Sequence, residues 1–363
     1  MAERTPQGGG RGRVPQATMR DVAELAGVGI GTVSRVFSKV GSVAPETRTR
    51  VEAAAKKLNY RPSALGRDLK RRTTNNIGLI VTDISNNFYG EFAQGVLSSA
   101  KELGRHVILC ASGEDVETER EYIDLLVEQR VDGIIAFPTG ENLDAWRSAR
   151  DLGINILFAD REVPGLGIPS ILADNMGGAR QLTEYLLALG HRRIGYLGGP
   201  LHLTTGRLRE EGYRRAFADG GLAVDESLVI RTRFTRDTAY ASAMRLLDAA
   251  VPPTALIAAN NILGEAALTA VRDKGLIVPR DISVVMFDDV PWAKLVQPPV
   301  TVVVQPSWQM GQSAARMVLA IGSGTTQSQT SPIEMVIRRS ARALHIDPPA
   351  RQDIGTEDNG TPT

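Results

Sequence analysis

Several side chains that could hold a small polar molecule stand at or near the ends of apolar runs of this sequence. The planar ones are Asp160, Arg161, Arg209, Asn260 and Asp288. Carboxylates, guanidinium groups and amides of this kind donate and accept hydrogen bonds in pairs, which is the chemistry that binds the paired hydroxyls of a sugar ring. Taken singly, an aspartate at a strand end is more often a turn or cap residue. The support for a binding site therefore comes from the five residues together.

Catalytic and metal-binding patterns are missing from the sequence. The histidines His106, His191, His202 and His345 are not paired at the spacing of metal ligands. The glycine-rich stretch Gly195-Tyr-Leu-Gly-Gly199 lacks the Gly-x-Gly-x-x-Gly pattern that opens a nucleotide-binding helix, and neither a phosphate loop nor a nucleophile elbow is present. We therefore expect no enzyme, no metal and no cofactor.

Length and composition indicate a soluble protein of two or three domains. The chain has 363 residues, of which 42% are hydrophobic and 23% charged. It contains neither a signal peptide nor an apolar run near the roughly twenty residues of a membrane span. Cys110 is its one cysteine and stands in an apolar run, which predicts a buried thiol in a reducing cytoplasm.

Charge is unevenly distributed along the chain. Residues 1–72 hold 15 lysines and arginines against 6 acidic residues, whereas the remainder holds 27 against 35. Small domains are often basic by chance, but a basic head on an acidic body also suggests that the head contacts a polyanion.

The basic head has the pattern of a compact helical domain. A first helix is predicted after Thr18, with Asp21 completing a capping box, and Gly27 marks its end. Its apolar face is predicted to hold Val22, Leu25 and Ala26. A second helix would turn Val33 and Val36 inward and Ile30, Gly31, Ser34 and Arg35 outward, and a third begins near Pro45. A helix, a tight turn and a second helix is the arrangement that fits a DNA major groove.

The body alternates between strands and helices. Predicted strands are residues 77–82, 106–110, 133–137, 154–159, 194–198, 255–259, 283–287 and 300–304, and predicted helices are residues 89–103, 176–189, 207–218 and 262–274. The strands are continuous runs of valine, isoleucine and leucine, typical of parallel sheets covered on both faces. About ten strands in this length predict two α/β lobes rather than one sheet.

Three motifs together carry a resemblance to a known family: Asp21-Val-Ala-Glu-Leu-Ala-Gly-Val28, Thr32-Val-Ser-Arg-Val36 and Leu58-Asn-Tyr-Arg-Pro62. With the α/β body, they resemble the lactose-repressor (LacI) family of bacterial transcription regulators, from about Thr18 to Ile346. The resemblance implies a small all-α helix-turn-helix DNA-binding domain, followed by a two-lobed effector domain like the periplasmic sugar-binding proteins. The domains expected from it are the helix-turn-helix domain (17–62), a hinge helix and linker (63–75) and an effector domain (76–346). Composition alone predicts a disordered basic arm before them (1–16) and a disordered tail after them (347–363). The lobes of the effector domain would be residues 76–172 with 304–331, and residues 173–303 with 332–346.

The resemblance also assigns DNA contacts. Ile30, Gly31 and Arg35 match the family's base readers, with Arg35 suited to guanine and a phosphate contact as its alternative. Plausible phosphate donors are Thr18, Thr32 and Ser34. In the hinge, Leu69 matches a leucine that wedges into the central base step, and Lys70 follows it. The alternative for Leu69 is ordinary packing against the body.

Among the periplasmic sugar-binding proteins, the effector domain resembles especially the ribose-binding one. Ten residues of this chain match the sugar contacts of its pocket. They are Asn86, Phe88, Tyr89, Asp160, Arg161, Arg209, Phe234, Asn260, Asp288 and Gln305. Two neighbours depart from the family pattern: Asn87 replaces a usual proline, and Asn261 replaces a usual aspartate, which suggests a change in lobe closure.

The sequence thus predicts a cytoplasmic, nucleoid-associated homodimer that binds palindromic operator DNA. It would act as a repressor of a sugar-utilisation operon, controlled by ribose or a related pentose. The alternative is a solute-binding or sugar-sensing protein without a DNA role.

Overall fold

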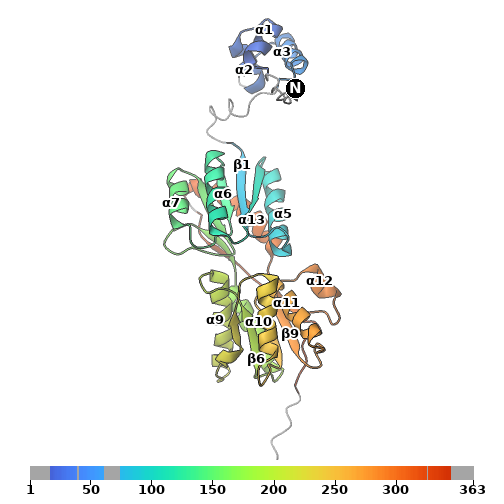
Figure 1. The fold of residues 1–363 in the computed structure, drawn as a ribbon. Coiled ribbons are helices and arrows are strands. Elements are labelled where there is room, and N and C mark those ends of the chain that lie inside the picture. Colours follow the sequence, from blue (N-terminus) through green and yellow to red (C-terminus); the bar gives the residue numbers. More distant parts are fainter. Residues whose placement is uncertain (1–16, 39–40, 61–73, 325, 345–363) are drawn as a thin grey trace, which may run out of the picture. The chain divides into compact units, whose positions relative to one another are not determined.

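The structure is a computed structural model, drawn in Figure 1, that describes residues 17–38, 41–60, 74–324 and 326–344. The chain divides into two compact units with the boundary between Thr74 and Asn75, and each unit is described by itself. Three expectations lie outside the described residues: the arm (1–16), the hinge helix with Leu69 and Lys70, and the tail (347–363).

The described part of the first unit contains three helices, α1 (Met19–Ala26), α2 (Ile30–Ser38) and α3 (Pro45–Lys57). The predicted capping box is confirmed at the start of α1. The Thr18 hydroxyl accepts a hydrogen bond from the Asp21 backbone N–H at 3.3 Å, and the Asp21 carboxylate accepts one from the Thr18 N–H at 2.7 Å. The helix ends at Gly27, whose φ of 64° is the left-handed conformation in which a Cβ is strained.

Val22, Val33 and Val51 form the centre of the core of this unit, and each is fully buried. The prediction for Leu25 is wrong, because its side chain is 44% exposed while Ala23 is buried. At about 100° per residue, Val22, Ala23 and Ala26 share one arc of α1, and Leu25 lies roughly 100° from the centre of that arc. The apolar face is therefore rotated by roughly 60° about the helix axis and made of smaller residues than the sequence indicated.

The described residues of the second unit form two sheets of six strands each. The first has the order β11-β5-β4-β3-β1-β2, and all its paired strands are parallel. Its strands are β1 (Asn76–Val81), β2 (His106–Ala111), β3 (Gly133–Ala136), β4 (Asn155–Ala159), β5 (Ser170–Ala173) and β11 (Gln329–Ser331). The second has the order β12-β10-β9-β8-β6-β7 and is parallel except for the edge pair β10–β12. Its strands are β6 (Ile194–Gly198), β7 (Val229–Arg231), β8 (Ala255–Ala258), β9 (Ser283–Phe287), β10 (Thr301–Val304) and β12 (Glu334–Val336).

Helices cover both faces of each sheet, as Figure 1 shows. Around the first sheet lie α5 (Asn87–Glu102), α6 (Val116–Glu128), α7 (Leu143–Asp151) and α13 (Ser307–Ala320). Around the second lie α8 (Asn175–Ala188), α9 (Thr204–Asp219), α10 (Arg236–Leu247), α11 (Asn261–Asp273) and α12 (Pro291–Leu295). Single turns of 3₁₀ helix span Glu226–Leu228 and Ile321–Ser323. Successive residues of β9 point to opposite faces of the sheet. Phe287 meets α8 at Gly178 on one face, and Met286 meets α11 at Gly264 on the other.

The helices α5 and α13 cross at two glycines. A Cβ built on Gly311 would lie 2.0 Å from the Phe92 carbonyl oxygen, and one on Gly95 would lie 2.1 Å from that of Trp308. Because backbone atoms are on both sides of the contact, neither helix has a flexible side chain that could yield. This crossing fixes α5, whose first turn carries residues of the candidate site.

We expect Gly311→Ala to lower the free energy of unfolding by about 1–3 kcal/mol, because overpacking at the crossing outweighs the roughly 1 kcal/mol that alanine adds to helix propensity. Urea denaturation of the full chain measures the difference. The control is Gly90→Ala in α5, where a Cβ would meet its nearest neighbour at 3.9 Å. Equal stability of the two variants would contradict the prediction.

Within residues 74–324 and 326–344 the chain crosses between the sheets at three places: after β5, after β10, and between β11 and β12. Each lobe is consequently assembled from separate stretches of sequence. All eight predicted strands are present with ends within one residue of the prediction, whereas β5, β7, β11 and β12 were not predicted. Cys110 is free and buried, as expected. None of the described helices is long and apolar enough to cross a membrane.

Candidate functional site

The outward face of α2 presents the expected base readers of the first unit. Ile30 is 45% exposed, and Gly31 and Arg35 are also exposed, while Val33 and Val36 are turned into the core. Thr32 and Ser34 are half-buried. The buried valines hold α2 against α1 and α3, so the remaining face of α2 is open to a partner.

Arg35 lies back along its own helix. Its Nε donates to the Gly31 carbonyl at 3.3 Å, and its Nη2 donates to the Thr32 hydroxyl at 3.4 Å. Because both hydrogen bonds are long and therefore weak, little free energy is lost when the guanidinium extends to another acceptor. Thr18 differs, because its hydroxyl donates to the Asp21 carboxylate at 2.8 Å, and a phosphate contact requires that bond to break.

The ten residues matched to sugar contacts line one cavity in the second unit, which we call the inner cavity. Its lining is Asn86, Phe88, Tyr89, Asp160, Arg161, Thr205, Arg209, Phe234, Asn260, Asp288 and Gln305. Most of them follow the carboxyl ends of parallel strands in both sheets, which is where open α/β sheets bind ligands. Thr205, in the first turn of α9, is the one lining residue that sequence reasoning missed.

Two aspartates of the inner cavity have strained backbones. Asp160 follows β4 with a φ of 62°, and Asp288 follows β9 with a φ of 74°. A residue with a side chain in this region costs free energy that the surrounding structure has to offset, and such residues cluster at binding sites. The strain directs both carboxylates into the cavity and supports a role beyond a turn.

Arg209 and Asp160 approach each other inside the cavity without forming a hydrogen bond. Arg209 Nε donates to Asn175 Oδ1 at 2.7 Å, and the guanidinium carbon lies 4.1 Å above the centre of the Phe287 ring. Arg209 Nη2 is 3.9 Å from Asp160 Oδ1, which has no hydrogen-bond partner among the described residues. A ligand hydroxyl between the two atoms could accept from Arg209 and donate to Asp160.

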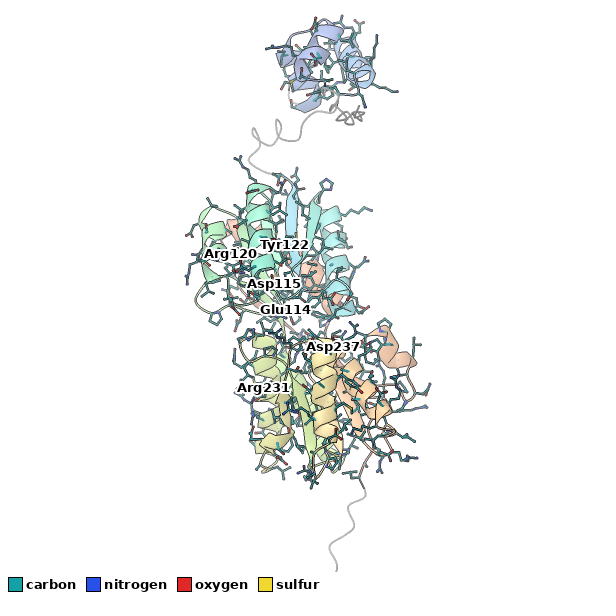
Figure 2. The ribbon with its side chains drawn as sticks, viewed as in Figure 1. Glu114, Asp115, Arg120, Tyr122, Arg231 and Asp237 are labelled. Atoms are coloured by element: carbon teal, nitrogen blue, oxygen red, sulfur yellow. The ribbon has the colours of Figure 1, made fainter. Side chains whose placement is uncertain are left out.

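Arg161 is held rigidly by a residue outside the predicted set. Its guanidinium is 2% exposed and binds the Glu114 carboxylate through both terminal nitrogens, at 2.8 and 2.5 Å. Glu114 follows β2 with a φ of 62° and lies at the end of its sheet that faces the second sheet (Figure 2). Within the described part of the chain, Arg161 Nε has no partner.

On the other side of the cavity, Gln305 and Asp288 form a pair. Gln305 Nε2 donates to Asp288 Oδ1 at 2.6 Å, and the backbone N–H of Asn261 donates to Asp288 Oδ2 at 3.2 Å. Gln305 Oε1 is buried without a partner in the described structure. Burial raises the pKa of Asp160 above its ordinary value, and Arg209 and Arg161 oppose that shift. Burial likewise raises the pKa of the Tyr89 hydroxyl, so it remains a neutral donor.

The inner cavity has little free space. The volume open to the centre of a water-sized sphere is about 20 Å³, which is about one water molecule. A second, outer cavity of about 240 Å³ is lined by Asp83, Phe234, Thr235, Arg236, Asp237 and Ile262. Because Phe234 lines both, the two cavities are neighbours, and Asp237 is labelled beside the junction of the sheets in Figure 2. No cluster of potential metal ligands occurs in the described residues.

Comparison with known proteins decides the family. Residues 18–63 match the model of the bacterial regulatory proteins of the lacI family, and residues 183–341 match the periplasmic binding protein-like domain. The HTH-type transcriptional regulator DegA of Bacillus subtilis (strain 168) is 35% identical over 337 residues, covering 91% of this chain and 99% of DegA. The chain belongs to the LacI family.

Solved structures of the family agree with the fold. A lac repressor dimer bound to operator and the anti-inducer ONPF is 29% identical, with a TM-score of 0.77, and the match covers 91% of this chain and 100% of that one. A putative ribose operon repressor from Burkholderia thailandensis is 36% identical, with a TM-score of 0.66, and the match covers 72% of this chain and 98% of that one.

Membership in the LacI family determines the class of function. The chain is a DNA-binding transcriptional repressor that responds to a sugar or another small molecule, and it is not an enzyme. The alternative of a solute-binding protein without a DNA role does not fit the match of residues 18–63.

Proposed function

We propose that this LacI-family repressor binds a neutral sugar, ribose or a related pentose, in the inner cavity. The observation that carries the proposal is a set of three buried polar atoms without hydrogen-bond partners among the described residues: Asp160 Oδ1, Arg161 Nε and Gln305 Oε1. Each belongs to a residue that lines the cavity. Two acceptors and one donor left unpaired cost free energy until a ligand supplies the matching hydroxyls.

The charges of the cavity disfavour an anionic ligand. Asp160 and Asp288 are two carboxylates, and Arg209 and Arg161 are two guanidinium groups, of which Arg161 is already paired with Glu114. With that pair set aside, two carboxylates face one guanidinium, so an anionic ligand would add to an excess of negative charge in a buried site. A polyhydroxylated ring satisfies donors and acceptors of both kinds without adding charge.

The aromatic residues supply the apolar part of such a site. Phe88 and Tyr89 pack edge-on, with ring centres 5.2 Å apart, and Phe234 lies at the boundary with the outer cavity. These rings offer faces for the C–H surfaces of a sugar. The relative from Burkholderia thailandensis, described as a ribose operon repressor, supports the choice of a pentose.

Ligand binding in this cavity is coupled to the relation between the two lobes. About 20 Å³ does not hold a pentose, so the lobes have to separate before a sugar enters. A ligand that favours one lobe arrangement shifts the protein toward it, and typical couplings of about 1–3 kcal/mol give roughly 5–150-fold control of DNA binding.

For the DNA-binding unit, the proposal is a homodimer on a palindromic operator, located at the bacterial nucleoid. It is supported by the exposed face of α2 and by the lac repressor relative, which is described as a dimer bound to operator. Ile30, Gly31 and Arg35 would contact bases, and Thr32 and Ser34 would contact phosphates, as would Thr18 once released from Asp21. Leu69 and Lys70, outside the described residues, are proposed for the central minor groove.

A calorimetric panel tests the proposed ligand. We expect D-ribose or a related pentose to release heat on titration into the full chain, and acidic sugars to bind more weakly. Absence of heat with every pentose and hexose would reject the sugar assignment. Operator binding measured on the same preparation shows whether a titration without heat is due to inactive protein.

A further inference from the structure

A hydrogen bond between Asn86 and Asn261 joins the two lobes at the edge of the inner cavity. The Thr204 hydroxyl of α9 also bonds to the backbone of Glu162, after β4, across the same boundary. Asn86 comes just before α5, beside the first sheet, and Asn261 is the first residue of α11, beside the second. Asn261 Nδ2 donates to Asn86 Oδ1 at 2.9 Å. Both side chains are buried, with 4% of Asn261 and 8% of Asn86 exposed. A buried amide pair of this kind links segments that are 175 residues apart.

The direction of this bond is determined by a helix cap. Asn86 Oδ1 also accepts the backbone N–H of Phe88 at 3.1 Å, which caps the first turn of α5. The Asn86 amide cannot turn over without losing that cap, so it presents an oxygen toward Asn261. Only a donor at position 261 completes the contact, and Asn261 Oδ1 is left without a partner among the residues that the structure describes.

The bond lies in the wall between the inner and outer cavities. Asn86 lines the inner cavity, and its backbone N–H donates to the carbonyl of Asp83, which lines the outer one. Asn261 is followed by Ile262, also a residue of the outer cavity. The backbone N–H of Asn261 donates to Asp288 Oδ2 in the inner cavity. Asn261 therefore reaches two inner-cavity residues, Asn86 through its side chain and Asp288 through its backbone.

We propose that Asn261 is a positioning residue that holds the inner cavity closed and sets how tightly it retains its ligand. It aligns Asn86 and Asp288 across the lobe boundary, and its bond to Asn86 has to break when the lobes separate. The proposal rests on the proposed function only in taking the inner cavity as the ligand site.

The neutral amide is the suitable group at this position. An aspartate there would place a carboxylate oxygen against Asn86 Oδ1 and would add a negative charge beside Asp288. Alanine removes only the bond to Asn86. Asn261→Asp is therefore expected to disturb the closed arrangement more than Asn261→Ala does.

Hydrogen–deuterium exchange of the full chain, without ligand, tests the closed arrangement directly. We expect Asn261→Ala to speed exchange about 3–10-fold in peptides covering residues 84–92 and 258–266, which corresponds to the net value of one hydrogen bond. The matched control is Asn87→Ala, because the Asn87 amide bonds only to Glu91 within α5 in the described contacts. In the Asn86→Ala background, Asn261→Ala should have no further effect, because the bond is already absent.

The proposal is overturned if Asn261→Ala exchanges like Asn87→Ala in both peptides, or if its effect persists in the Asn86→Ala background. Titration of the same variants with D-ribose tests the ligand assignment independently of the exchange experiment. If D-ribose binds, Asn261→Ala should weaken it about 3–10-fold and Asn261→Asp more, while Asn87→Ala should not. If it does not bind, the pentose assignment fails and the exchange result still decides the role of Asn261.

Discussion

Replacing Arg209 by alanine is expected to remove measurable sugar binding by the inner cavity. The guanidinium is 3% exposed and lies between Asn175 and Asp160. Its loss removes a charge-assisted donor and leaves the Asp160 carboxylate without its counter-charge. Truncation of one partner in such a buried pair costs about 2–5 kcal/mol, or roughly 30-fold to several-thousand-fold in affinity. Calorimetric titration with the sugar identified by the panel measures the loss.

Arg207→Ala provides the matched control. Arg207 is exposed on the same helix, α9, and does not line the inner cavity. Its removal should leave sugar affinity unchanged. Thermal unfolding and operator binding without sugar show whether the Arg209 variant is folded. Sugar affinity of the folded Arg209→Ala protein within threefold of the Arg207→Ala value would exclude Arg209 from the ligand site.

Replacing Arg35 by alanine is expected to weaken operator binding by about 1–3 kcal/mol, roughly 5–150-fold, and to relax the preference for one guanine in each half-site. The physical reason is that the arginine fork bonds both acceptors on the guanine edge. The present contacts of Arg35, at 3.3 and 3.4 Å, are weak enough to exchange for a base. Fluorescence anisotropy with operators substituted at single positions provides the measurement.

Arg35→Lys separates base reading from phosphate contact. Lysine keeps the charge but lacks the planar fork, so it should retain a phosphate contact and lose the guanine preference. If Arg35 contacts only phosphate, the alanine variant will weaken binding to all sequences alike and reduce the salt slope by about one. A lysine variant with unchanged guanine preference would contradict the base-reading role.

Continuous apolar runs made much of the fold predictable from the sequence. Ile194–Gly198 and Ser283–Phe287 are buried on both faces, and their predicted and observed bounds coincide. The short edge strand Gln329–Ser331 could not be predicted, because it is three residues long, largely polar and formed by pairing with Ser170–Ala173 far back in the chain. Leu25 was misplaced because the apolar residues of one short helix do not show which side of it the other two helices cover.

The candidate site was predictable where its residues follow strands. Asp160, Asn260 and Asp288 could be singled out because parallel strands bring their carboxyl ends to one edge. Glu114 also follows a predicted strand, and that position was the available signal. Its importance comes from Arg161, 47 residues away, and such a contact exists only in three dimensions. The same holds for the bond between Asn86 and Asn261.

The helix α13 has a consequence for synthesis of the protein. It packs on α5 beside the first sheet, although it is made more than 200 residues later, after all but one strand of the second sheet. Until α13 emerges from the ribosome, the side of α5 that meets it at Gly95 lacks this partner. Newly made intermediates therefore expose apolar surface for most of translation. Chaperones bind species of this kind, and such species aggregate when they are overproduced.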